Sequence, residues 1–188
     1  MRAVRGSDIG HVGILSANPQ KPWQAERVSR TLIVMRHCKS AWPVGVRDLE
    51  RPLNARGERD APRMGTWIGE HVGAPDEARV SPARRTRQTW GLVSTALGIP
   101  REAADFDPGV YEATWWDLLD LIRRCPEQAR TLMLLGHNPT MEDLTDELAG
   151  SGDPDALKRA RLRFPTGAVA VLDSDSPCLL YTSDAADE

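Results

Sequence analysis

The sequence predicts an α/β protein, a three-layer α/β/α sandwich built around a mostly parallel central sheet. Three apolar segments of strand length, 31–35, 78–80 and 131–135, are each followed by polar residues and then by the start of a helix. The first of them, TLIVM, is apolar without alternation, which is typical of a parallel strand buried on both faces. Strands that alternate with helices in this way indicate a mostly parallel sheet covered by helices.

Helices are expected between and after these strands. Residues 56–71 place apolar or small side chains on one helical face, and residues 114–124 open with a Thr-x-x-Asp capping signal. A helix over 140–148 is expected to stop at Gly150, and a last strand, 168–172, follows a Pro-Thr-Gly turn. In such a fold ligands bind beyond the carboxyl ends of the strands, so the residues that follow the strands are the candidates for a functional site.

The composition fits one soluble domain. The chain has 188 residues, of which 40% are hydrophobic and 27% charged, with a net charge of −3. This charge gives no general attraction to nucleic acid or anionic membranes, and no apolar run reaches the roughly 20 residues of a membrane helix. No secretory signal is evident, and three widely spaced cysteines make neither a disulfide framework nor a metal knuckle. A cytoplasmic protein without nucleic-acid or membrane partners is expected.

Both ends of the chain are interpreted separately from the domain. Residues 1–30 show no sustained periodicity and are expected to form a tail, or to lie upstream of a true start at Val28. Residues 178–188, CLLYTSDAADE, resemble the translation of a transposon-type sequencing adapter, so residues 176–188 are expected to be non-native; a genuine acidic tail is the alternative. The domain is therefore expected over residues 31–175, truncated at its carboxyl end.

Histidine and arginine side chains gather at one predicted edge of the sheet. Arg36 and His37 directly follow the first strand, and His137 follows the third. An isolated Arg-His pair would most often be satisfied by backbone carbonyls, but here a second histidine arrives at an equivalent strand end. With Ser81 as N-cap of the next helix, Arg85 falls in its first turn, where backbone N–H groups favour an anion. Together these residues predict a cationic pocket suited to a phosphoryl group.

Six short segments resemble, in order, the motifs of the histidine phosphatase superfamily, and most closely those of its short, SixA-type phosphohistidine phosphatase branch. The resemblance covers about residues 31–173 and implies a minimal, cap-less histidine phosphatase fold that works without a metal or other cofactor. Cys38 departs from the pattern, since the superfamily usually has Gly there and this branch often Ala. We expect this small thiol to pack rather than to act as a nucleophile. The matching segments are LIVMRHCKS (32–40), RPLNARG (51–57) with DAPRMG (60–65), SPARRTRQT (81–89), YEA (111–113), GHNP (136–139) and PTGA (165–168).

The resemblance implies a catalytic set. His37 would accept the phosphoryl group to form a phosphohistidine that water then hydrolyses, and its other ring nitrogen should donate to a backbone carbonyl. Arg36, Arg85 and His137 would hold the three equatorial oxygens of the transferring group. The family pattern selects Arg85 rather than the adjacent Arg84.

Two further assignments keep an alternative. Arg51 is a candidate phosphate ligand by resemblance to the Arg-Pro-Leu motif, but a salt bridge with Asp48 or Glu50 is equally compatible with the sequence. Glu112 is the candidate general acid, because larger members of the superfamily have a catalytic Glu in this region; a capping or surface role is its alternative. Asn54, which precedes a predicted helix, is expected to be its cap.

The absence of long insertions between the motifs suggests an open site, which favours phosphohistidine on a protein, such as a phosphotransfer domain, as substrate. A phosphatase for small phosphomonoesters would share every catalytic residue. A non-catalytic phosphate-binding module is a different class, which the intact set of histidines and arginines disfavours. A metal hydrolase using His37, Cys38 and His137 is disfavoured because no third ligand has metal-site spacing.

Overall fold

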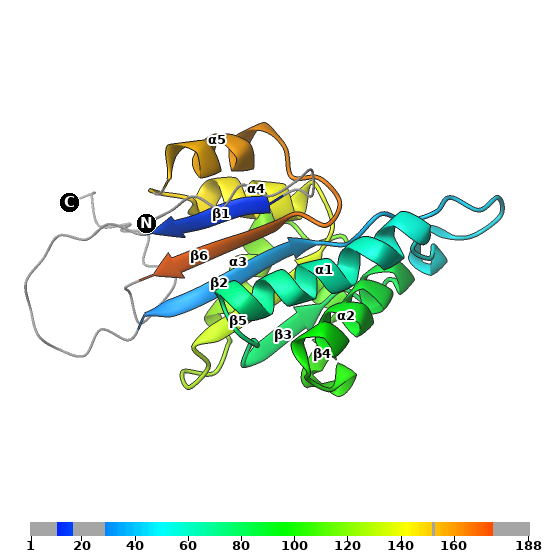
Figure 1. Cartoon of the computed structure of the whole chain (residues 1–188), viewed down its shortest axis with the longest axis horizontal. Coiled ribbons are helices and arrows are strands. Elements are labelled where there is room, and N and C mark those ends of the chain that lie inside the picture. The colour runs from blue at the N-terminus through cyan, green and yellow to red at the C-terminus, as the bar shows by residue number, and fades with distance from the viewer. Residues whose placement is uncertain (1–10, 17–28, 152, 175–188) are drawn as a thin grey trace, which may run out of the picture.

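Six strands form a single sheet in the computed structural model, which describes residues 11–16, 29–151 and 153–174. In space the strands follow the order β1-β6-β2-β5-β3-β4 (Figure 1). Strands β2, β5, β3 and β4 are parallel to one another, whereas β6 runs antiparallel to β2 and β1 is parallel to β6. The predicted mostly parallel sheet is thus confirmed. The strands are His11–Ser16 (β1), Arg30–Arg36 (β2), Glu77–Val80 (β3), Ala104–Phe106 (β4), Thr131–Gly136 (β5) and Val169–Ser174 (β6).

Helices cover both faces of this sheet, which confirms the three-layer architecture. The side chains of β2 alternate between the two faces: Ile33 packs in a core with Met64 of α1, and Leu32 packs in a second core with Leu118 of α3 and Leu144 of α4. Both faces of the strand are therefore apolar, as expected for a central strand. The helices are Ala55–His71 (α1), Arg84–Leu97 (α2), Trp115–Arg123 (α3), Thr140–Leu148 (α4) and Pro154–Leu162 (α5), with 3-10 turns at Asp48–Glu50 (η1), Arg101–Ala103 (η2) and Pro108–Val110 (η3).

Three elements were not predicted from the sequence. Strand β4 has only three residues, too few to show a period, and α5 has four charged residues among its nine. Strand β1 lies within the segment expected to be a tail and pairs along β6. Val28 and the segment 176–188 lie outside the described residues, so the expected start and the expected non-native end stay predictions. None of the described helices is long and apolar enough to cross a membrane.

Two helices, α1 and α3, begin with the N-caps that the sequence predicts, whereas α2 does not. The Asn54 side chain accepts a hydrogen bond from the Gly57 N–H, and Thr114 forms a reciprocal capping box at the start of α3. The predicted N-cap at Ser81 is wrong, because α2 begins at Arg84 and Ala83 occupies the cap position without a side-chain hydrogen bond. The Ser81 hydroxyl instead contacts His137. Arg85 still falls in the first turn of α2.

Close backbone contacts hold the segment that leaves β2. A Cβ atom on Gly57 would lie 2.2 Å from the Lys39 carbonyl oxygen, so only glycine lets α1 approach this segment. The Asn54 N–H donates to the same carbonyl, and Ser40 forms an isolated antiparallel bridge with Leu53. On the other side, the Gly167 N–H donates to the carbonyl oxygens of Arg36 and His37. The residues after β2 are therefore fixed by backbone contacts from both sides.

Candidate active site

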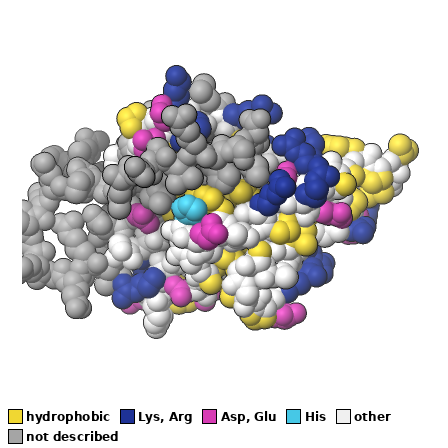
Figure 2. Space-filling model, in the orientation of Figure 1, with side chains coloured by type: hydrophobic (Ala, Val, Ile, Leu, Met, Phe, Trp, Pro, Cys, Tyr) yellow, Lys and Arg dark blue, Asp and Glu magenta, His cyan; other side chains and the backbone are white. Residues whose placement is uncertain are grey.

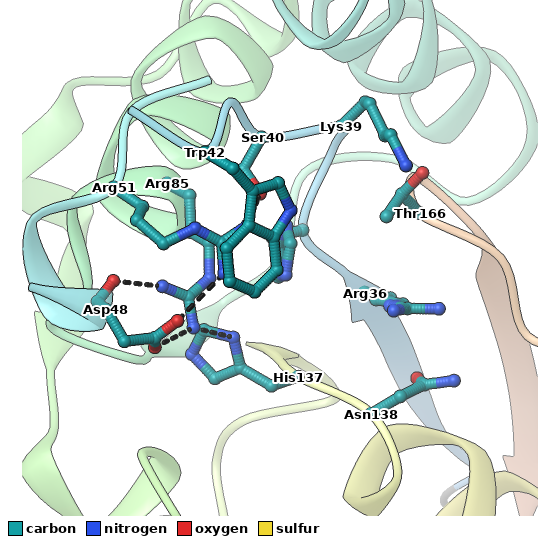
Figure 3. Close-up of a pocket in the computed structure, with 11 residues that line it drawn as sticks. Arg36, Lys39, Ser40, Trp42, Asp48, Arg51, Arg85, His137, Asn138 and Thr166 are labelled. Carbon is teal, nitrogen blue, oxygen red and sulfur yellow. Dashed lines mark hydrogen bonds and ion pairs between the residues drawn. The ribbon is translucent and has the colours of Figure 1, made fainter. Parts of the chain in front are cut away.

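A polar pocket of about 380 Å³ opens at the carboxyl ends of β2 and β5 (Figure 3). The edge is the one that the sequence predicts. The fold brings there residues from β2 and the segment after it, from α2, from the segment between β5 and α4, and from the turn before β6. Most lining residues carry hydrogen-bond donors, and four of them are Arg or Lys. The pocket is lined by Arg36, His37, Lys39, Ser40, Trp42, Asp48, Arg51, Arg85, His137, Asn138 and Thr166.

His37 is buried at the end of β2, with 7% of its surface exposed. Its Nδ1 lies 2.7 Å from the Cys38 carbonyl oxygen. Because a carbonyl can only accept, Nδ1 carries the proton and Nε2 keeps its lone pair. Burial, helped by the nearby charges of Arg85 and Arg36, lowers the pKa of His37 to about 4. The imidazole is therefore neutral at pH 7 and has one free nucleophilic nitrogen.

His137 follows β5 and has the opposite tautomer. Its Nδ1 lies 3.2 Å from Nη2 of Arg85, which can only donate, so the ring proton is on Nε2. This Nε2 lies 2.7 Å from the Ser81 hydroxyl. Burial and the proximity of His37 lower the pKa of His137 to about 3. The ring of His137 is tilted by 58° from that of His37 with centroids 5.1 Å apart, and neither ring adds a positive charge at neutral pH.

Arg36 reaches the pocket from the last position of β2. Its Nη1 donates to the Phe164 carbonyl at 2.8 Å, and its Nε is buried without a hydrogen-bond partner among the described residues. The Asn138 side chain donates to the same Phe164 carbonyl at 2.9 Å. A buried guanidinium N–H without a partner is costly, and an anion in the pocket would satisfy such a donor.

Arg85 is 5% exposed and is held by Asp48 and His137. Its Nη1 donates to the Asp48 backbone carbonyl at 2.6 Å, and its Nη2 donates to the Asp48 carboxylate at 2.8 Å. The side chain from α2 is thus tied to η1 across the pocket. Like Arg36, it keeps a buried Nε without a partner in the described part of the chain.

Arg51 forms the salt bridge that was one of its two interpretations from the sequence, and its role as a phosphate ligand stays a prediction. Its Nη1 forms a salt bridge with the Asp48 carboxylate at 2.8 Å, and the residue also lines the pocket. Its other donors reach the Ala41 carbonyl and the Ser40 hydroxyl, while the Trp42 ring stacks on its guanidinium at 3.1 Å. Arg51 is consequently fixed at one wall of the pocket.

Asp48, which the sequence indicates only as a salt-bridge partner of Arg51, also lines this site. Its carboxylate meets Arg51 and Arg85, and the Tyr111 hydroxyl donates to it at 3.0 Å. Although partial burial opposes ionisation, these three hydrogen bonds lower the pKa of Asp48 to about 2. The Asp48 carboxylate is therefore an anion of the protein itself that binds two of the pocket's arginines. In the sequence, its position three residues before Arg51 was the signal that could have indicated this role.

Glu112 lies beside the pocket rather than among its lining residues. Its side chain is exposed, and its backbone has φ of 60°, the left-handed region that non-glycine residues seldom adopt. The neighbouring Tyr111 meets the His137 ring edge-on, with centroids 5.4 Å apart. The role of Glu112 as general acid stays a prediction.

Cys38 packs in the core, as the sequence predicts. Its side chain is fully buried, and burial raises the pKa of its thiol to about 12. A thiol with this pKa is protonated at neutral pH and is a poor nucleophile. Among the described residues no group of three or more His, Cys, Asp or Glu side chains is arranged to hold a metal ion.

An α/β/α sandwich with two neutral histidines and three arginines at the carboxyl edge of its sheet is typical of a protein that binds an anionic ligand there. The chain belongs to the histidine phosphatase superfamily, whose branch 1 model matches residues 32–133. It is therefore a phosphatase of that superfamily, and its likeness to solved structures supports the SixA-type branch.

The similar proteins cover most of this chain. Uncharacterized protein Rv1276c of Mycobacterium tuberculosis H37Rv is 37% identical over 140 residues, which span 73% of this chain and 85% of that protein. A structure from Agrobacterium tumefaciens, proposed to be the phosphohistidine phosphatase SixA, is 33% identical with a TM-score of 0.67 and covers 77% of this chain and 92% of its own. Its counterpart from Nakamurella multipartitia is 31% identical with a TM-score of 0.66 and covers 79% and 86%.

Proposed function

We propose that this phosphatase removes phosphoryl groups through a phosphohistidine intermediate on His37, without a metal ion, and that its substrate is phosphohistidine on a protein. The observation that carries the proposal is the state of His37. The imidazole is neutral, its Nδ1 proton is held by the Cys38 carbonyl, and its free Nε2 belongs to a pocket with Arg36, Arg85 and His137.

The reaction has two displacements. The Nε2 lone pair of His37 attacks phosphorus, the P–N bond of the substrate breaks, and the departing imidazole takes a proton from solvent. Water then attacks the phosphorylated His37, the new P–N bond breaks, and inorganic phosphate leaves. Arg36 and Arg85 stabilise the equatorial oxygens through charge-assisted hydrogen bonds worth roughly 1.5–3 kcal/mol each.

His137 has a conditional role in this scheme. In the described structure its single ring proton points to Ser81, and its Nδ1 accepts from Arg85. A phosphoryl dianion in the pocket would raise the pKa of His137, because an opposite charge favours the imidazolium form. A second proton on the ring would then let it donate to a phosphoryl oxygen alongside Arg85.

Two observations favour a phosphohistidine substrate. An imidazole leaving group needs less acid assistance than an alkoxide, which suits a pocket whose candidate acid, Glu112, is exposed outside the lining. The solved structures from A. tumefaciens and N. multipartitia are themselves proposed to be phosphohistidine phosphatases.

The test compares the wild type, His37→Ala and His71→Ala on a phosphorylated histidine phosphotransfer domain and on an aryl phosphate, with a chelator present. His71 is the matched control, because it lies on α1 and stacks on Trp67. We expect His37→Ala to lose activity on both substrates by at least about three decades, since no other nucleophile replaces it. His71→Ala should match the wild type.

Three outcomes would contradict parts of the proposal. Equal activity of His37→Ala and wild type would show that His37 is not the nucleophile. Loss of wild-type activity in chelator would show that the enzyme needs a metal ion. Rapid turnover of the aryl phosphate or of small metabolite esters, with none on the phosphorylated domain, would assign the enzyme to small phosphomonoesters instead.

A further inference from the structure

A loop beside the pocket, residues 41–47, carries most of the exposed hydrophobic side chains. Among the described residues the large hydrophobic side chains that are exposed are Trp42, Val44 and Val46 in this loop, at 76%, 103% and 39%, and Trp116 on α3. The loop leaves the carboxyl end of β2 and projects beyond the rest of the molecule (Figure 1). Three such side chains within five residues of sequence are more than scattered surface exposure would give.

The base of the loop is fixed, although its tip is exposed. The Ala41 N–H donates to the Pro52 carbonyl at 2.9 Å, next to the Ser40–Leu53 bridge. Trp42 stacks on Arg51 and also lines the pocket. Trp42 is therefore held at the rim of the pocket, and Val44 and Val46 follow it on the projecting part of the loop, where a surface that surrounds a bound phosphoryl group would meet them.

The rim next to the loop is basic. Lys39, two residues before the loop, and Arg47, its last residue, are both exposed. Asp48 is neutralised by two arginines, and Glu50 is the other acidic residue of the stretch 39–50. Figure 2 shows hydrophobic side chains on the projecting end of the molecule and Lys and Arg side chains beside it.

We propose that loop 41–47 is the docking site for the protein that carries the phosphohistidine, and that the partner offers an apolar patch bordered by acidic residues around the modified histidine. This inference rests on the proposed function and adds the chemistry of the partner. An apolar centre with a charged border is the usual composition of a specific protein interface, and the opposite charges would speed encounter. A small phosphorylated molecule would enter the pocket without covering the tip of the loop.

Val44 offers a clean test, because its side chain is wholly exposed and does not line the pocket. The variants are Val44→Ser, Val44→Asp and Val44→Lys, with Thr66→Asp, at an exposed position of α1, as the control for added charge. The substrates are free phosphoramidate and a phosphorylated histidine phosphotransfer domain that has acidic residues around its histidine. The measured quantity is kcat/KM on each substrate.

For the phosphorylated domain we expect kcat/KM to fall several-fold in Val44→Ser and about tenfold or more in Val44→Asp, and less in Val44→Lys than in Val44→Asp. On phosphoramidate all variants should match the wild type, and Thr66→Asp should match it on both substrates.

Unchanged kcat/KM on the domain in all three Val44 variants would overturn the docking role while leaving the proposed function intact. Equal losses on both substrates would overturn it too, because the loop would then act through the pocket. Equal losses in Val44→Asp and Val44→Lys would overturn the acidic character of the partner. A wild type active on phosphoramidate but inactive on the domain would instead refute the proposed protein substrate, and the docking role with it.

Discussion

At the scale of single residues, the site's positive charge lies on arginine side chains, whereas its two histidines are neutral. Arg51 and Arg85 are 7% and 5% exposed, and the Asp48 carboxylate and backbone carbonyls accept hydrogen bonds from both guanidinium groups. Burial keeps His37 and His137 neutral. This division leaves the nucleophile unprotonated beside cations that attract its anionic substrate.

The substitution Asp48→Asn tests this balance. Removing the internal anion makes the pocket more cationic, so inorganic phosphate should inhibit about tenfold more strongly. The free energy of unfolding should fall by about 1 kcal/mol, because Arg51 and Arg85 lose a counter-charge that is itself 47% exposed. The inhibition constant for phosphate and a urea titration measure the two effects. Asp105→Asn, which removes an edge-strand carboxylate paired with Arg79, is the control, and equal inhibition constants in Asp48→Asn and this control would contradict the role given to Asp48.

At the scale of elements, a close contact between α1 and α2 sets the separation of these two helices. A Cβ atom on Gly65 would lie 2.7 Å from the Val93 carbonyl oxygen and 2.8 Å from the Ala96 Cβ. The two helices approach this closely because glycine stands at the crossing. Since α2 carries Arg85, the separation of the helices bears on the geometry of the pocket.

The pair Gly65→Ala and Gly69→Ala separates packing from helix propensity. Alanine is the better helix former, so Gly69→Ala, whose new Cβ would meet only Leu97 at 3.4 Å, should stabilise the fold by roughly 0.5–1 kcal/mol. Gly65→Ala should destabilise it by about 1–3 kcal/mol despite the same gain in propensity, because the helices must move apart. Thermal or urea unfolding of both variants measures this, and stabilisation by Gly65→Ala would disprove the close contact.

At the scale of the whole molecule, stability should depend on pH through the two buried histidines. Their pKa values in the folded state, about 4 for His37 and about 3 for His137, lie below the 6.5 of an unperturbed histidine. The unfolded chain therefore binds more protons than the folded one below pH 6.5. Stability is complete above that pH and is lost as the pH falls towards 4, by up to about 2 kcal/mol for each histidine at pH 5.

A comparison of wild type, His37→Asn and His71→Asn in urea at pH 7 and pH 5 checks this dependence. The wild type and the His71→Asn control should lose stability between the two pH values, and His37→Asn should lose less. The wild type and His71→Asn, observed by NMR, should show His37 as the neutral Nδ1–H tautomer throughout this range. A midpoint near pH 6.5 for His37 would contradict the burial argument.

The amino-acid sequence by itself determined the alternation of strands and helices, the two-sided apolar strands and the residues that end them. The sequence also predicted that four site residues lie close together, because the carboxyl ends of parallel strands meet at one edge of a sheet. These residues are Arg36, His37, Arg85 and His137. The small size of Cys38 likewise indicated packing.

The tertiary structure alone decided which partners these side chains have. Ser81 contacts His137 instead of capping α2, and Asp48 joins Arg51 to Arg85, 34 residues further along the chain. It also decided that β6 runs antiparallel to β2, with β1 on its far side. Such contacts depend on where distant segments come to lie, and no local period or capping pattern encodes them. The strand-end position of His37 can therefore be predicted from the sequence, whereas its neutral state and its free Nε2 follow from burial and from its contact with one backbone carbonyl.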